Sequence, residues 1–334
     1  MDDSTYSMVI ESAEKLFSDR GGKDFDPALW AAVEEAGFPL ALLSEDRGGY
    51  GLSAREAFAP VRVAAAHGVA LPLGETLLAN WVLGAADLDP IEGPAALAWD
   101  GKAAVPFGRF LKTVVQLCET DAGLAVSVLH PRAEDWQPAL NYAGEARDTL
   151  TLAAQAKPDA HIACAPVVLR AAMAMLRAVQ IAGTTDAVAA MCINYCNERE
   201  QFGRPLSKHQ AIQHQLAVLA TQGCAAAVAA DMAVAAFDRA LEQSDPFVLS
   251  AAAAKVRAAE AATTVSSISH QVHGAIGFSE EYPLHRLTCR LWSWRDEDGS
   301  EAHWAKHLAD WAVSLQSGGH LWPALTACDL REAT

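Results

Sequence analysis

The residues best placed to do chemistry lie between Glu198 and Gln210, where the sequence reads Glu-Arg-Glu-Gln-Phe-Gly-Arg-Pro-Leu-Ser-Lys-His-Gln. Gly203 and Pro205 interrupt two Ala-rich, apolar-periodic runs here. This predicts a turn between two long helices, with Ser207 as the N-cap of the second. Helix ends leave backbone N–H groups free, and the stretch adds cationic and amide side chains beside the aromatic Phe202. The combination can hold an anion together with a flat ring; a solvated charged corner is the alternative.

A second segment with related features reads Gln271-Val272-His273-Gly274-Ala275-Ile276-Gly277-Phe278 and is followed by Glu281-Tyr282-Pro283-Leu284. It is similar to the Gln-x-x-Gly-Gly-x-Gly segment of the acyl-CoA dehydrogenase family of flavoenzymes and to the Glu-Tyr-Pro-Leu that follows it. The first stretch, Arg199-x-Gln201-Phe202-Gly203-Arg204-Pro205, resembles another signature of the same family. A Gly-rich loop from Leu42 to Ser53 is similar to its N-terminal Pro-Glu-x-x-Gly-Gly-x-Gly segment, with Ser44 where Pro is usual. The resemblance covers nearly the whole chain and is clearest in its last third.

This resemblance implies that the chain binds FAD. In the family, the Arg-Phe-Gly turn and the glycine segment reach across a dimer interface to the adenine-diphosphate half of the partner's FAD. Carried over position by position, the resemblance implies a set of cofactor-binding residues: Arg199, Gln201, Phe202, Leu206, Gln210, Gln271, Gly274, Ala275 and Ser300.

The resemblance also implies a reaction, in which a carboxylate removes the α-proton of an acyl-CoA thioester and flavin N5 takes the β-hydride. Counted without gaps from Gly274, the family's Tyr-Glu-Gly-Thr tetrad falls on Glu297-Asp298-Gly299-Ser300, so Asp298 stands at the position of the catalytic base. Because Asp is one methylene shorter than Glu, either the backbone lies closer or Asp298 is not the base. Glu297 is the neighbouring candidate, and a solvated turn residue or cap is the alternative for Asp298. The stretch from Arg170 to Arg177, where some relatives carry the base, contains no carboxylate.

The middle of the chain lacks the family's Thr-Glu-Pro-Gly-type loop, which packs on the flavin ring; Ala96–Gly101 stands in about that place. The family residues that contact a partner's cofactor are thus present in this sequence, whereas those that contact the chain's own cofactor are missing. This pattern resembles the short acyl-CoA dehydrogenase subunits that work only as heteromers, many of them in bacterial steroid degradation. We therefore expect an α₂β₂ heterotetramer or similar assembly with a full-length subunit, and a fatty-acyl or steroid CoA thioester as substrate. An electron-transfer flavoprotein is the expected acceptor. A non-catalytic subunit that completes the partner's FAD site is the alternative, and a flavin-free helical scaffold is a third.

The elements that position these residues follow from the periodicity of the sequence. Residues 1–84 predict an N-terminal helical domain, with helices near 4–18, 27–37, 55–67 and 73–84 and with Ser53 as an N-cap. From 85 to 160, Pro and Gly separate short β-like runs that predict a small, reduced antiparallel sheet or barrel. Residues 161–334 predict a C-terminal four-helix bundle. Its last helix starts near Glu301, and Ser300 is the predicted N-cap of that helix. The fold class is therefore mainly α with a small β domain, in the α–β–α order of the acyl-CoA dehydrogenase fold.

Charge and cysteine content limit the remaining function classes. The net charge of −16 at pH 7 argues against nucleic acid or an anionic membrane surface as a partner. No basic and apolar leader opens the sequence, and charges such as Lys255 interrupt the long Ala runs, so we expect neither a signal peptide nor a membrane span. The 7 cysteines are scattered without a Cys-x-x-Cys motif, which is typical of reduced thiols in a cytoplasmic protein.

Other candidate residues have two readings each. His303 and His307 have the i, i+4 spacing of metal ligands, but no third ligand is in view, so we expect surface histidines and no metal. His270 and His273 flank Gln271 and suit packing as well as a place near the cofactor. The tryptophans at 292, 294, 304 and 311 predict core and interface positions. Three arginines could counter a CoA phosphate or form a solvated face: Arg286, Arg290 and Arg295.

Overall fold

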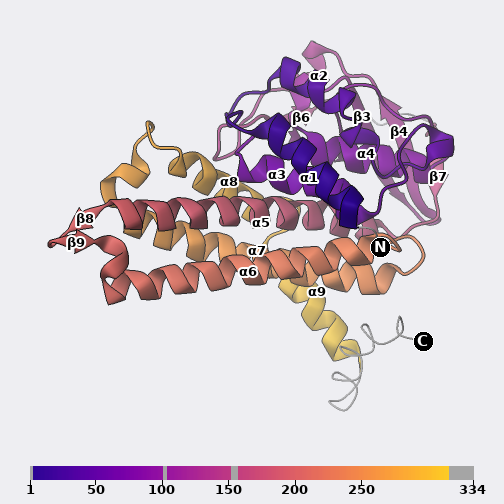
Figure 1. Ribbon diagram of the computed structural model, residues 1–334. Helices are drawn as coiled ribbons and strands as arrows, with labels where there is room; N and C mark the ends of the chain where they lie inside the picture. Colours follow the sequence, from indigo (N-terminus) through magenta and orange to yellow (C-terminus); the bar gives the residue numbers. More distant parts are fainter. Residues whose placement is uncertain (1–2, 101–103, 152–156, 316–334) are drawn as a thin grey trace.

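A computed structural model describes residues 3–100, 104–151 and 157–315 of the chain (Figure 1). Four helices come first: α1 (Asp3–Phe17), α2 (Pro27–Glu35), α3 (Ala54–Ala66) and α4 (Leu73–Ala85). Ser53 caps α3 in a capping box, because its side chain accepts from the Glu56 N–H while the Glu56 carboxylate accepts from the Ser53 N–H. The helices and the cap predicted for this part of the chain are confirmed.

Short strands follow in two small sheets. One sheet has the order β1 (Ala95–Trp99), β3 (Thr113–Thr120), β4 (Gly123–Leu129), β7 (Ala160–Ile162); the other has the order β2 (Ala104–Pro106), β6 (Arg147–Leu150), β5 (Trp136–Gln137). The prediction of a wholly antiparallel sheet is wrong for one pair, since β1 and β3 run parallel. The crossover between them contains β2, and such a crossover returns the chain in its original direction. The domain limits at 84 and 160 stay predictions.

The rest of the described chain is helical: α5 (Pro166–Glu198), α6 (Gln210–Phe237), α7 (Ser244–His273), α8 (Leu284–Asp296) and α9 (Glu301–Ser314). The first three are long and pack side by side, and α8 and α9 both pack on α7. The sequence predicts α5, α6, α7 and α9 but does not single out α8. As predicted, Ser300 caps α9, with its hydroxyl accepting from the His303 N–H. This agrees with the mainly α class and with a C-terminal bundle.

Helix α5 joins the two ends of the molecule. Its first half lies beneath the N-terminal helices and strands, and its second half runs along the bundle away from them (Figure 1). By length and composition α5 and α6 could each cross a membrane, which corrects the expectation that no stretch is long and apolar enough. In the most apolar window of α5, however, 83% of the residues are buried in the protein, as in the core helix of a soluble protein.

Candidate functional site

The turn between α5 and α6 is a β-hairpin. Strands β8 (Glu200–Gln201) and β9 (Arg204–Pro205) pair antiparallel, and the two loop residues between them, Phe202 and Gly203, both have positive φ, of 54° and 77°. Two positive φ angles are typical of a type I′ turn, which Gly favours and a bulky residue does not. The side chain of Phe202 is 90% exposed. The hairpin thus holds an aromatic ring in solvent, at a backbone conformation that Phe adopts at a cost.

The predicted helix start after this turn is wrong by two residues, since the N-cap of α6 is His209 and not Ser207. Leu206–Lys208 form a 3-10 turn, and α6 begins at Gln210, so Ser207 is not its N-cap. The backbone carbonyl of Ser207 instead accepts a 2.9 Å hydrogen bond from the side-chain amide of Gln213. The hairpin and the 3-10 turn take up the residues that the sequence assigns to the start of the helix. His209 lies across the hairpin, with Nε2 3.3 Å from the Gln201 carbonyl oxygen.

A glycine turn lies at the same end of the bundle. Helix α7 ends at His273, and Gly274 has φ 62° and ψ −141°, a conformation that only glycine adopts readily. The rings of Tyr195 and His273 stack with their centroids 4.4 Å apart, which brings the ends of α5 and α7 together. His273 is buried and contacts the Ser269 carbonyl oxygen and the Tyr282 hydroxyl. Burial lowers the pKa of His273 despite the hydrogen bond to Ser269.

Eight of the nine predicted cofactor-binding residues therefore lie at one end of the bundle. The side chains of Arg199, Gln201, Phe202, Gln210 and Gln271 are exposed there, together with Gly274 and Ala275, and Leu206 is half-buried. Ser300 is elsewhere, at the start of α9. At about 1.5 Å per residue, Arg199 lies roughly 33 Å beyond Arg177 along α5.

Asp298, the predicted base, belongs to a second cluster near the other end. It lies in the tight turn between α8 and α9, with φ 55°, and its main-chain oxygen accepts a 2.9 Å hydrogen bond from the Trp304 indole. One of its carboxylate oxygens, Oδ2, accepts a 2.7 Å hydrogen bond from Arg177 Nε. The side chain of Asp298 is 17% exposed and that of Arg177 is 2% exposed.

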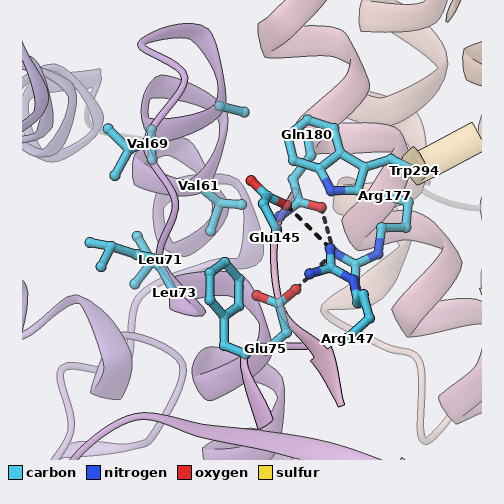
Figure 2. A pocket seen from close by; sticks show the side chains of 14 residues that line it. Val61, Val69, Leu71, Leu73, Glu75, Glu145, Arg147, Arg177, Gln180 and Trp294 are labelled. Carbon is cyan, nitrogen blue, oxygen red and sulfur yellow. Dashed lines mark hydrogen bonds and ion pairs between the residues drawn. The ribbon is translucent and has the colours of Figure 1, made fainter. Parts of the chain in front are cut away.

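Arg177 connects this turn to α4. Its Nη1 donates 2.7 Å hydrogen bonds to Glu75 Oε1 and to Gln180 Oε1 (Figure 2). Burial opposes the charge of Arg177, but Asp298, Glu75 and Glu297 outweigh it and raise the pKa of the guanidinium above its ordinary value. Arg177 is therefore a permanent cation among carboxylates.

Glu297 is held still more tightly. It accepts two hydrogen bonds from Arg147, of 2.9 and 3.1 Å, and one of 3.1 Å from Asn141. Burial alone would raise the pKa of Glu297, but Arg147 and Arg177 outweigh burial and bring this pKa to about 2. Glu145 continues the cluster, 3.4 Å from Arg147 and 2.6 Å from Arg290. We call these residues the charge cluster: Glu75, Glu145, Arg147, Arg177, Arg290, Glu297 and Asp298.

The sequence does not identify most of this cluster. The expectation that Arg290 contacts a CoA phosphate or lies on a solvated face is wrong, because Arg290 is buried. Arg286 is exposed, and Arg295 forms an ion pair with Asp296. The one available signal is Arg177 itself, a charged residue between Met175 and Val179 on the buried face of α5. Trp294 and Trp304 are buried, as expected, whereas Trp292 and Trp311 are half-buried. Among the described residues, no group of three His, Cys, Asp or Glu side chains is placed to hold a metal ion.

Residues 168–312 match the family model "Acyl-CoA dehydrogenase, C-terminal domain". Acyl-CoA dehydrogenase IpdE2 of Mycobacterium tuberculosis is 28% identical over 81% of this chain and 81% of its own length. Residues 168–312 thus belong to the acyl-CoA dehydrogenase family. FAD is the cofactor of this family.

Other acyl-CoA dehydrogenase relatives match over less. Acryloyl-CoA reductase (NADH) of Anaerotignum propionicum is 32% identical over 32% of this chain, and the match spans only 26% of that relative's length. Among solved structures, the ChsE4-ChsE5 complex from Mycobacterium tuberculosis has a TM-score of 0.81 at 19% identity, covering 95% of this chain and 98% of that one. The steroid acyl-CoA dehydrogenase Tcur3481-Tcur3483 has a TM-score of 0.80 at 21% identity, covering 93% and 98%. These structures share the fold.

The hairpin end of the bundle suits one half of FAD, whereas the charge cluster does not suit the other half. At the hairpin, exposed Phe202 offers a ring for stacking, and Arg199, Arg204 and Lys208 offer cations for a diphosphate in a chain that is otherwise strongly acidic. This donor set fits the adenine-diphosphate half. The two cavities beside Arg177, one of which Asp298 lines, measure only about 20 and 10 Å³. Such volumes hold a water molecule, whereas sites for molecules of flavin-ring size measure about 300 Å³ or more, so this cluster does not fit the ring.

Proposed function

We propose that this chain is a subunit of an FAD-dependent acyl-CoA dehydrogenase and completes the FAD site of a full-length partner subunit. The observation that carries the proposal is the hairpin end of the bundle, where an exposed aromatic ring, cations and a glycine turn gather. Arg199, at this end, lies roughly 33 Å along α5 from Arg177, the residue that holds the Asp298 carboxylate. A cofactor half bound at the hairpin therefore belongs to a reaction centre outside this chain's own Asp298 region.

In this proposal each part of the bundle end has a distinct role. Phe202 stacks on the adenine, and Arg199 balances the diphosphate charge. Gln201, Gln210 and Gln271 supply amide groups, Leu206 supplies an apolar floor, and the small residues Gly274 and Ala275 let backbone N–H groups approach the phosphates. Ser300 lies outside this group, and we assign it to the cap of α9 only.

The assembly would desaturate a CoA thioester between its α and β carbons. When bound, FAD supplies an acceptor for the β-hydride, and this chain contributes by fixing the position of the nucleotide end. Two similar proteins, the ChsE4-ChsE5 complex and a steroid acyl-CoA dehydrogenase, support a hetero-oligomer and a steroid-derived or fatty-acyl substrate as proposals. An electron-transfer flavoprotein as acceptor and a cytoplasmic location belong to the same proposal.

Truncating the stacking ring tests the proposal. Base–aromatic stacking contributes about 1–3 kcal/mol, so Phe202→Ala in the reconstituted complex should weaken FAD binding by roughly tenfold or more, and Arg199→Ala should act in the same direction. Titration of the apo-complex with FAD, followed by flavin fluorescence, measures this. Tyr142→Ala removes another exposed aromatic ring, which is 76% exposed, and should leave FAD affinity unchanged. Unaltered affinity in Phe202→Ala would contradict the proposal.

A further inference from the structure

We propose that the carboxylates at the base position, Asp298 and Glu297, form a structural lock in this chain, which holds neither a flavin ring nor a thioester of its own. The inference rests on the proposed function. It adds that the reaction takes place in the partner subunit and not in this chain. It follows from the contacts, the charges and the free volume of the charge cluster.

The contacts of the two carboxylates are the first step. A general base must reach the proton that it removes, at hydrogen-bond distance and with a free lone pair directed at it. Glu297 instead receives three hydrogen bonds from Arg147 and Asn141 and also lies 3.4 Å from Arg177. Asp298 is bonded to Arg177 at 2.7 Å. Arg177 and Arg147 thus already occupy lone pairs of these carboxylates that a general base would direct at its substrate.

The charges are the second step. Three buried arginines face four carboxylates, and Lys255 lies close enough to interact with Asp298 and Glu297 electrostatically. Arginine does not give up its proton in a protein, so the pairs persist at any pH where the carboxylates are ionised. Cations held against a carboxylate also lower its basicity, and Arg147 and Arg177 lower the pKa of Glu297 in this way. The cluster therefore stabilises the ionised carboxylate and makes it a weaker base.

The free volume is the third step. Side chains of Leu97, Pro106 and Met173 close around Arg177 and Asp298 and leave about 10 Å³. On the other side of Arg177, the cavity lined by Glu75, Glu145, Arg147 and Trp294 leaves about 20 Å³ (Figure 2). Neither admits a thioester or a three-ring flavin without displacement of the arginines.

The lock has a positive role as well, because it ties four separate elements together. Glu75 belongs to α4, Arg147 to β6, Arg177 to α5, and Glu297 and Asp298 to the turn after α8. Loss of one member leaves another charge buried without its partner, which strongly destabilises a protein. We therefore assign these residues to holding the N-terminal helices, the strands and the bundle in one arrangement.

The flavin content of the purified heteromeric complex tests the inference without any need for a destabilised variant. Flavin is released by denaturation and compared with the amount of each subunit. The lock predicts one FAD per pair of unlike subunits. Two FAD per pair would overturn the lock but leave the proposed function standing, and no flavin at all would overturn both.

A variant of the lock gives a second readout. Asp298→Asn in the complex should leave kcat within about twofold and lower Tm by roughly 5 °C or more, because the buried Arg177 charge loses one of its carboxylate partners. Asp296→Asn removes an exposed carboxylate in the same region and should alter neither quantity. A kcat at least tenfold lower for Asp298→Asn, with Tm unchanged, would show that Asp298 is the base and would overturn the lock.

Discussion

Lys255 shows how a single buried charge is stabilised in this protein. Its side chain is fully buried in α7, and its Nζ donates 2.7 Å hydrogen bonds to the carbonyl oxygens of Trp294 and Arg295 at the end of α8. These carbonyls are among those that a helix C-terminus leaves without partners, so Lys255 caps α8 from another helix. The cap fixes the start of the turn that carries Glu297 and Asp298.

Burial lowers the pKa of Lys255 from 10.5 to about 8, against the opposite effect of Asp298 and with the help of Arg177. The folded protein therefore binds fewer protons than the unfolded chain between about pH 8 and 10.5, so its stability rises with pH through that window. For a change of this size the gain is about 3 kcal/mol. In Lys255→Met this contribution is absent.

Urea unfolding between pH 7 and 10 measures the effect. Wild type should gain stability relative to Lys255→Met as the pH rises, whereas the matched change at an exposed lysine, Lys306→Met, should leave the pH dependence of wild type intact. An identical pH dependence in wild type and Lys255→Met would show that burying the charged amine does not lower the free energy of unfolding.

At the scale of residues, local signals in the sequence are sufficient for some predictions and not for others. Ser53 and Ser300 were identified as caps because a cap depends on the next three residues only. The pairing of Arg177 with Asp298 joins residues 121 positions apart in the chain, and nothing in the local pattern of either residue specifies the other. The roles of the predicted cofactor residues stay predictions.

The hairpin is the element on which the proposed cofactor site depends. Phe202 occupies a positive-φ position of a two-residue turn, where Asn and Gly are favoured. A backbone outlier of this kind points to a function for the ring, since a side chain that is 90% exposed gains little from its edge-on contact with the His209 ring, 6.1 Å away. A substitution of Phe202 should therefore lower FAD affinity without lowering the stability of the protein.

Phe202→Asn tests this separation. Because Asn adopts the left-handed region more readily than Phe, we expect Tm to stay the same or to rise by about 1–2 °C, while FAD affinity falls as far as in Phe202→Ala. Differential scanning calorimetry and FAD titration of the same preparation measure both quantities. A variant that keeps wild-type FAD affinity would exclude the ring from the cofactor site.

Long helices with clear periodicity were predictable, whereas their exact starts and the short elements were not. Helix α6 begins later than predicted because the hairpin and the 3-10 turn precede it. Helix α8 is short, and polar residues such as His285, Arg286 and Ser293 interrupt its pattern. The parallel pair of β1 and β3 depends on the path of the crossover, which periodicity does not describe.

On the scale of the whole molecule, α5 sets the distance between the two clusters. Its first half carries Arg177 in the charge cluster, and its far end leads into the hairpin (Figure 1). One rigid helix thus separates the region that resembles a reaction centre from the surface that suits a nucleotide. The order of helices, strands and bundle was predictable from composition and from the family resemblance, and an assembly with a second subunit was expected from the same resemblance. The closed cavities beside Arg177, which also support the proposed division of the site, form between residues far apart in the chain, so the sequence does not reveal them.

The central claim is that the hairpin end of the bundle completes a flavin site on another subunit. Its most direct test is the flavin content of this chain purified alone, compared with the chain co-expressed with a full-length acyl-CoA dehydrogenase subunit encoded by a neighbouring gene. We expect the chain alone to be colourless and inactive, and the co-purified complex to be yellow and active. A yellow, active assembly of this chain alone would contradict the account.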